Sequence, residues 1–96
     1  MRVKMSKEGR LREEIVNVAS QLFSRGYTHG STGNISAVID DCLLLTPTGS
    51  SFGSLDPARI SKVDARGNLI SGDQPTKEQF MHHAIYSGRK SAGAVI

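Results

Sequence analysis

Two short stretches of the chain gather residues that could hold an anion. The first is the Gly-Ser-Thr-Gly-Asn-Ile-Ser run at residues 30–36, and the second is the Thr-Pro-Thr-Gly-Ser-Ser run at residues 46–51. Glycine lets the backbone approach a ligand closely, and hydroxyl and amide side chains together with free N–H groups can surround a negative charge. Because a single expected hairpin separates the two stretches, they could lie side by side. The sequence therefore predicts a phosphate site made by two loops.

A carboxylate and a histidine follow at helical spacing. Glu78 falls in the first turn of an expected helix, and His82 lies four residues later on the same face. Glu78 is either a capping-turn residue favoured by the helix dipole or a general acid/base beside the loops. His82 and His83 point about 100° apart on a helix, so they cannot chelate a metal together, and a packed or surface histidine is the simpler interpretation. Lys77 opposes the helix dipole, so it is either a solvated side chain or a functional one.

The elements that must position these residues can be located from apolar spacing and turn chemistry. Apolar residues recur at helical spacing from Leu11 to Phe23, and Gly26 follows, which predicts an amphipathic helix over residues 10–25. We expect strands over residues 35–39 and 42–45, joined by a tight turn. The second of these strands is apolar on both faces, so it should lie inside a covered sheet.

The second half of the chain carries similar signals. Asp56 and Pro57 predict a short helical turn over residues 56–59, and residues 60–63 and 67–70 flank a second hairpin turn. A capping box, Thr76 with Gln79, predicts a second helix that Gly88 ends. Its expected apolar face consists of Phe80, Met81, Ala84 and Ile85. Residues 92–96 begin an apolar strand, and we expect the chain to be truncated within it.

Composition narrows the function classes. The 96 residues suit one small domain, and four of the 12 basic residues lie in the first ten positions. We therefore expect residues 1–10 to form a flexible tail, and no nucleic-acid binding, because no basic stripe is interleaved with aromatic residues. The single cysteine, Cys42, suits a reducing compartment, and no signal peptide or membrane-span pattern is found. We expect a soluble, cytoplasmic protein without membrane contact.

Four motifs in order resemble the class II aldolase/adducin family. They are Gly33-Asn34-Ile35-Ser36, Thr46-Pro47-Thr48-Gly49, Ser71-Gly72-Asp73 and Pro75-Thr76-Lys77-Glu78, and the helix text at residues 80–86 and the end at residues 94–96 also fit. Residues 50–57 and the Lys77-Glu78 pair are most similar to the branch acting on four-carbon sugar-acid phosphates, which includes 3-oxo-tetronate 4-phosphate decarboxylases. The resemblance covers the chain from about Leu11 to its last residue.

This resemblance implies a fold and a site. The fold would be α/β, three-layer α/β/α with a largely antiparallel central sheet, of which residues 11–96 form the N-terminal portion, usually assembled as a homotetramer. The catalytic acid/base would be Glu78. The substrate phosphate would bind at Gly33, Asn34, Thr48 and Gly49, with Thr76 and Lys77 as a further polar pair in the same pocket. Fuculose-phosphate-type aldolases have two serines at these two positions. Lys77 could instead form an ion pair with the carboxylate of a sugar acid.

The resemblance also implies an activity and a metal. The family's enzymes are carbon–carbon lyases, aldolases or decarboxylases of phosphorylated sugars or sugar acids, in which a divalent metal, zinc, stabilises an enediolate. The zinc ligands come from a His-x-His pair after the strand that begins at Ala94 and from a later histidine. Those positions do not exist in this sequence, so we expect no metal ligands in the chain. Whether the chain is itself an enzyme stays open, and the alternative is a non-catalytic, adducin-head-like binding or assembly module.

Overall fold

The computed structural model describes residues 6–26, 34–88 and 94–95. The two α-helices among them are α1 (Lys7–Ser24) and α2 (Gln79–Gly88), and the two 3-10 helices are η1 (Phe52–Ser54) and η2 (Pro57–Arg59). The strands are β1 (Ser36–Ile39), β2 (Cys42–Leu45), β3 (Ser61–Val63), β4 (Leu69–Ser71) and β5 (Ala94–Val95). Neither described α-helix combines the length and the apolar composition of a membrane span.

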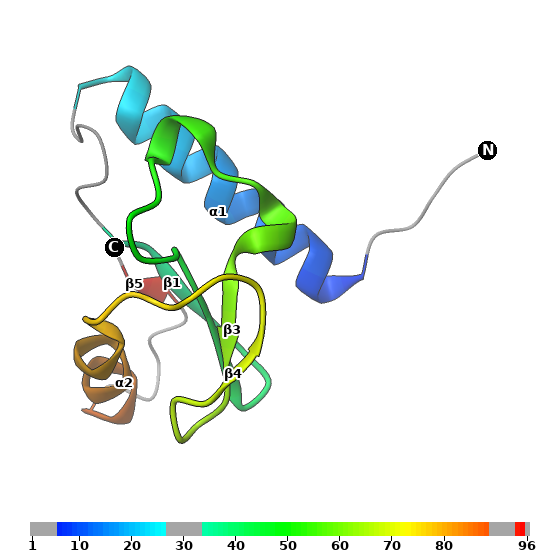
Figure 1. The fold of residues 1–96 in the computed structure, drawn as a ribbon, viewed down its shortest axis with the longest axis vertical. Helices are drawn as coiled ribbons and strands as arrows, with labels where there is room; N and C mark the ends of the chain where they lie inside the picture. The colour runs from blue at the N-terminus through cyan, green and yellow to red at the C-terminus, as the bar shows by residue number, and fades with distance from the viewer. Residues whose placement is uncertain (1–5, 27–33, 89–93, 96) are drawn as a thin grey trace.

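The strands form one antiparallel sheet in the order β4-β3-β2-β1-β5. β1 pairs with β2 in the register Ser36 to Leu45, and the tight turn between them contains Asp40 with a φ of 51°. β5 returns to the free side of β1, where Val95 pairs with Ser36 (Figure 1). The expected antiparallel sheet is therefore confirmed, including both hairpins.

Alternation along β1 divides the core between the two faces of the sheet. On one face, Ala37 and Ile39 pack with Ile15 and Ala19 of α1, and the same cluster includes Phe52 of η1. On the other face, Leu43, Leu45 and Val63 form a second cluster.

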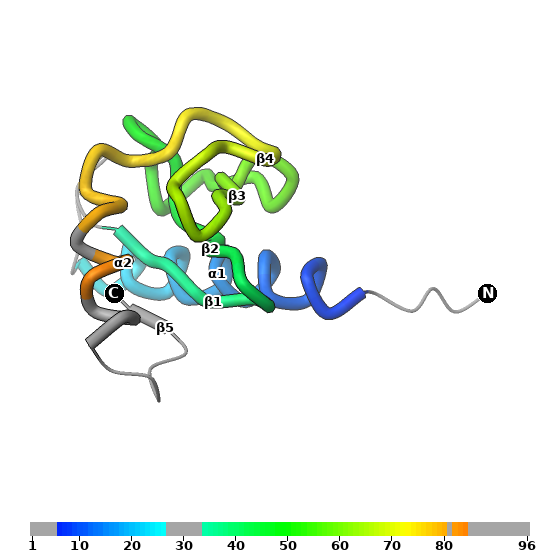
Figure 2. The backbone as a smooth tube through the Cα atoms, turned by 90° about the horizontal axis from the view of Figure 1, so that it is seen from below, coloured from blue at the N-terminus to red at the C-terminus, as the bar shows by residue number. Residues whose placement is uncertain are grey.

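The two α-helices lie on opposite faces of the sheet. Ser36 contacts His82 of α2, whereas its neighbour Ala37 packs toward α1. Figures 1 and 2 show α1 running along the strands and α2 beside one end of them. This is the three-layer α/β/α arrangement, and β2 is buried on both faces as its composition predicts.

α1 begins earlier than its apolar spacing indicates. Ser6 is the N-cap, and its side chain accepts a hydrogen bond of 3.0 Å from the backbone N–H of Gly9. Residues 7–10 are therefore helical instead of belonging to a tail, and residues 1–5 lie outside the described residues. A serine cap five residues before the first apolar position, Leu11, is a signal that overrides the missing apolar pattern.

The expected apolar face of α2 is wrong in its described part. Phe80 is 67% exposed and Ala84 is also exposed, whereas His82 is only 6% exposed. The side chains of Met81 and Ile85 lie outside the described residues. The helix is rotated so that a polar residue, His82, meets the sheet, because Ser36 offers it a hydrogen-bond partner there.

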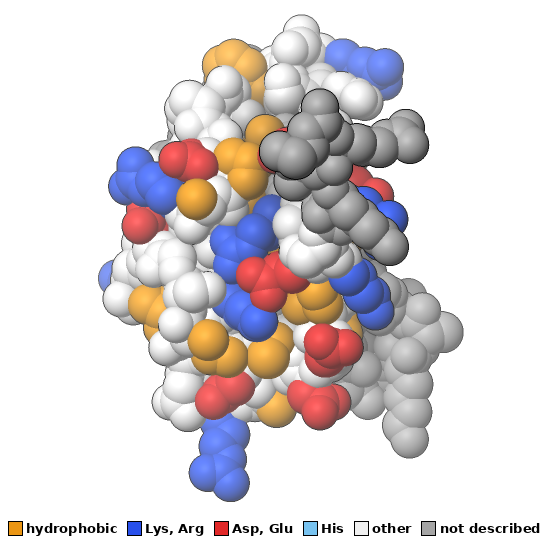
Figure 3. Space-filling view, turned by 90° about the vertical axis from the view of Figure 1, so that its right-hand side faces the viewer, with side chains coloured by type: hydrophobic (Ala, Val, Ile, Leu, Met, Phe, Trp, Pro, Cys, Tyr) orange, Lys and Arg blue, Asp and Glu red, His pale blue; other side chains and the backbone are white. Residues whose placement is uncertain are grey.

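A buried arginine joins α1 to the other side of the domain. Arg12 Nη1 donates to the carbonyls of Pro57 and Ile60, both at 2.8 Å, and Nη2 donates to Ser71 Oγ at 3.2 Å. Glu8 accepts from Arg12 Nε at 3.0 Å and also from a lysine of β3 at 2.6 Å. Acidic and basic side chains lie close together on the face shown in Figure 3.

Candidate functional site

Thr46 sets the position of the first loop at the end of the β1–β2 pair. Its N–H donates to the carbonyl of Ile35 at 3.0 Å, and its Oγ1 accepts from the N–H of Ile35 at 3.2 Å. Thr46 is fully buried, so both bonds are shielded from water. The ladder therefore continues beyond β1 and β2, and it brings Asn34 and Pro47 to the same end of the sheet.

The second loop lies against the segment that leads into α2. The N–H of Thr48 donates to the carbonyl of Gln74 at 3.0 Å, and Pro47 forms a bridge with Pro75. Gly49 has a φ of +70°, a conformation that favours glycine, and the turn there is closed by Ser50 Oγ, which donates to the carbonyl of Pro47 at 2.7 Å. Backbone contacts thus hold the loop at residues 46–51 against residues 74–75, next to Thr76 and Lys77.

Thr76 caps the start of α2. Its Oγ1 accepts from the N–H of Glu78 at 3.3 Å, its carbonyl accepts from the N–H of Gln79 at 3.2 Å, and the residue is 7% exposed. Glu78 therefore lies one residue before α2 instead of inside its first turn. The reciprocal bond of a capping box is absent, since Gln79 Oε1 is buried without a partner among the described residues.

Asn34 and Glu78 meet directly. Asn34 Nδ2 donates a hydrogen bond to Glu78 Oε2, although the two residues are 44 positions apart. Asn34 is half-buried and Glu78 is exposed, so the pair lies at the surface where a ligand could reach it. An amide donor next to a carboxylate combines a group that can hold an anion with one that can move a proton.

A second polar bond lies directly beneath this pair. Ser36 Oγ is hydrogen-bonded to His82 Nδ1, and the exposed fractions of the two residues are 0% and 6%. Burial is the main cause that lowers the pKa of His82 below 6.5; the neighbouring His83 lowers it further, and the charge of Glu78 opposes the shift. His82 is therefore neutral at pH 7, with one ring nitrogen as donor and the other as acceptor.

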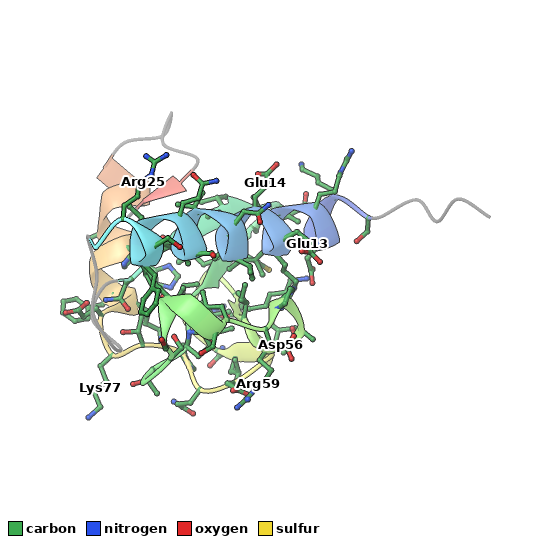
Figure 4. The ribbon with its side chains drawn as sticks, turned by 90° about the horizontal axis from the view of Figure 1, so that it is seen from above. Glu13, Glu14, Arg25, Asp56, Arg59 and Lys77 are labelled. Carbon is green, nitrogen blue, oxygen red and sulfur yellow. The ribbon has the colours of Figure 1, made fainter. Side chains whose placement is uncertain are left out.

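The structure gathers most of the sequence-predicted site residues. Asn34 and Glu78 are in contact, and the Thr48–Gly49 turn is bonded to the strand-like segment that ends at Thr76. Lys77 does not join them: its side chain is exposed and points away from the body of the fold (Figure 4). Gly33 lies outside the described residues.

A hollow of about 230 Å³ adjoins the second loop and includes charged residues that the sequence did not single out. Arg59 Nη2 lies 2.6 Å from Asp73 Oδ2 across it, and Asp56 lies on the same side. Figure 4 shows Asp56 and Arg59 on η2 and its cap, separated from Lys77. Thr48 and Gly49 also line this hollow, and two carboxylates against one guanidinium disfavour an anion on the side that Asp56 and Asp73 form.

The described residues do not fit a metal site. Within residues 6–26, 34–88 and 94–95, no group of three or more histidine, cysteine, aspartate or glutamate side chains could hold a metal ion. Glu78 and His82, four positions apart in the sequence, engage Asn34 and Ser36. The polar groups that the described part of the site offers are an amide, hydroxyls and a carboxylate.

This chain is similar in sequence and fold to known proteins. The chain is 49% identical over 92 residues to 3-oxo-tetronate 4-phosphate decarboxylase of Cupriavidus necator, covering 96% of this chain and 42% of that one. It is 38% identical over 85 residues to L-fuculose phosphate aldolase of Methanocaldococcus jannaschii, covering 88% and 46%. The crystal structure of YgbL from Escherichia coli superposes with a TM-score of 0.89 at 47% identity, covering 93% and 44%.

The chain thus spans less than half the length of these relatives. The resemblance inferred from the four motifs is confirmed, as is the similarity to the sugar-acid-phosphate branch. The model of the class II aldolase and adducin N-terminal domain matches residues 13–96. The chain belongs to the class II aldolase and adducin family.

Proposed function

We propose that this chain supplies the phosphate-binding and acid/base portion of a carbon–carbon lyase acting on a phosphorylated sugar acid. The observation that carries the proposal is the contact between Asn34 and Glu78, next to a loop turn that is bonded to the segment before α2. The relatives named as 3-oxo-tetronate 4-phosphate decarboxylases and fuculose phosphate aldolases support the substrate class.

In this proposal each residue has a separate task. The backbone N–H of Gly49, the Thr48 hydroxyl, the Asn34 amide and the Thr76 hydroxyl would hold the phosphate, with Gly33 beside them, because the Thr48 N–H is already bonded to the Gln74 carbonyl. Lys77 would have to turn toward the pocket to meet a substrate carboxylate, because its ammonium points outward (Figure 4).

Glu78 would handle the proton. When the carbon–carbon bond of a 3-oxo acid breaks, carbon dioxide leaves and the electron pair stays on the adjacent carbon as an enediolate. As the general acid, Glu78 would deliver a proton taken up from solvent to that carbon, or to the equivalent position after aldol cleavage. A divalent metal would stabilise the same negative charge in the family's enzymes. The described residues do not fit a site for it.

The phosphate site can be tested on the chain itself. Inorganic phosphate, titrated into isotope-labelled protein, should shift the backbone amide signals of Thr48 and Gly49 and the side-chain amide signal of Asn34. Asn34→Ala should weaken binding by roughly tenfold, since one hydrogen bond to a charged group is lost. Asn68→Ala is the matched control, because the Asn68 side chain bonds only to Asp64. Shifts confined to surface lysines and arginines would contradict the proposal.

The catalytic role can be tested in a chimera in which this chain replaces the matching 92 residues of the Cupriavidus necator decarboxylase. Glu78→Gln should lower kcat by about 10²- to 10⁴-fold and leave KM within a few-fold. Glu13→Gln, on the exposed side of α1, is the control. A chimera that folds but leaves tetronate phosphates intact would favour the adducin-like, non-catalytic alternative.

A further inference from the structure

Two side-chain hydrogen bonds connect the start of β1 to α2, and their spacings match. Asn34 and Ser36 are two residues apart on an extended chain, which separates them by about 6.6 Å on one face. Their partners are Glu78, one residue before α2, and His82 within it; four residues at helical rise separate them by about 6 Å on one face. The Asn34–Glu78 and Ser36–His82 bonds therefore lie side by side, one step apart on both elements.

The two bonds differ in exposure. The outer bond joins an exposed carboxylate to a half-buried amide, whereas the inner bond joins residues that are 0% and 6% exposed. A ligand that binds Asn34, or a reaction that uses Glu78, must open the outer bond. The inner bond does not touch the candidate ligand site, so it can hold α2 in place while the outer bond opens.

α2 depends on this inner bond for its position. Among the α2 residues whose side chains the structure describes, Phe80 and Ala84 are exposed and His82 is the buried one. A rotation of the helix by one residue would turn His82 by about 100° away from Ser36 and carry Glu78 away from Asn34. A buried imidazole without its partner is unfavourable, so the pair admits one rotational position.

We propose that His82 is a positioning residue: its buried hydrogen bond to Ser36 fixes α2 against β1 and thereby places Glu78 beside Asn34. The placement of Glu78 beside Asn34 does not depend on the proposed function, but its importance for catalysis rests on the acid/base role proposed for Glu78. His82 acts through the placement of the helix and does not touch the substrate.

The atom involved gives the proposal a sharp test. The bond uses Nδ1, and the side-chain amide of asparagine places a polar atom at nearly the position of histidine Nδ1, whereas that of glutamine reaches nearly the position of Nε2. His82→Asn should therefore keep the contact with Ser36, and His82→Gln and Ser36→Ala should lose it. His83→Gln, one residue further along α2, is the matched control.

The readout is the side-chain amide signal of Asn34 in the 96-residue chain, recorded by NMR. We expect this signal to move in His82→Gln and Ser36→Ala to its position in Glu78→Ala, where the acceptor of the outer bond is removed directly. It should stay unchanged in His82→Asn and His83→Gln.

The outcomes separate the two proposals. An unchanged Asn34 signal in folded His82→Gln and Ser36→Ala would overturn the positioning role. The role would also be overturned if His82→Asn and His82→Gln moved the Asn34 signal equally, in proportion to their loss of stability in urea. If the wild-type chain does not bind phosphate, the proposed function fails, while the Asn34 signal still tests the positioning role of His82. If the His82 variants do not fold, Ser36→Ala, which removes one oxygen atom, decides the matter.

Discussion

Gly72 packs directly against the backbone of residues 59–60, so we expect Gly72→Ala to destabilise the fold. Gly72 has a φ of +85°, and a Cβ added to it would lie 2.1 Å from the carbonyl oxygen of Ile60 and 3.0 Å from that of Arg59. Both neighbours are backbone atoms, so they cannot swing aside as a side chain would. The same two carbonyls are occupied: Ile60 accepts from Arg12 Nη1 at 2.8 Å, and Arg59 accepts from the N–H of Asp73 at 2.9 Å.

The expected loss of stability has three physical sources. A left-handed φ costs an alanine about 1–2 kcal/mol relative to glycine. Separating the segments breaks the bond between Asp73 and Arg59, worth about 0.5–1.5 kcal/mol, and the charged bond from Arg12 to Ile60, worth about 1.5–3 kcal/mol. We therefore expect Gly72→Ala to lower the free energy of unfolding by about 3–6 kcal/mol, which is a large part of the total for a small domain.

Urea unfolding followed by circular dichroism measures this loss, with Gly26→Ala as the control. Gly26 has a similar φ of +77°, but a Cβ there would meet nothing within 4 Å. The control should therefore lose only about 1–2 kcal/mol. Alanine restricts the unfolded chain equally in both variants, so the difference between them isolates the close approach. A Gly72→Ala variant no less stable than Gly26→Ala would refute the reasoning.

Two further predictions follow from buried polar groups. Burial holds the pKa of His82 below 6.5, so the unfolded chain binds more protons as the pH falls through that value. The free energy of unfolding should therefore be highest above about pH 6.5 and fall as the pH is lowered below that value, toward the lowered folded-state pKa. His82→Asn should remove this slope in urea unfolding. Arg12→Lys should cost about 3 kcal/mol in the same assay, because an ammonium cannot bond the carbonyls of Pro57 and Ile60 as the guanidinium fork does. Arg10→Lys, on the exposed side of α1, should cost almost nothing, and an equal loss in both arginine variants would contradict this role for Arg12.

Local signals predicted most of the fold. The β1–β2 hairpin, η2 with its Asp56 cap, and the β3–β4 hairpin all follow from residues within a few positions of one another. The rotation of α2 did not follow, because it depends on Ser36, 46 positions before His82. Hydrophobic periodicity favours Phe80 as the buried residue. The hydrogen bond between His82 and the distant Ser36 buries His82 instead.

The candidate site shows the same division. Its residue types could be predicted, since small hydroxyl, glycine and amide residues in two loops indicate an anion. The contact between Asn34 and Glu78 could not be predicted, because the two residues are 44 positions apart and only the folded chain brings them together. The sequence singles out Lys77 because a lysine is unfavourable near a helix N-terminus. In the structure its side chain points outward, so no ligand is needed to explain a lysine at this position (Figure 4).

The sequence separations within the fold also bear on the order in which it assembles. β1 to β4 pair with their neighbours in sequence, so their contacts close short loops and carry a small entropic cost. Arg12, by contrast, bonds residues 45 to 59 positions away, and its acceptors are in place only when η2 and β4 have formed. The antiparallel strands should therefore form the folding nucleus, with α1 docking afterwards as its guanidinium leaves water for a pocket of carbonyls already built.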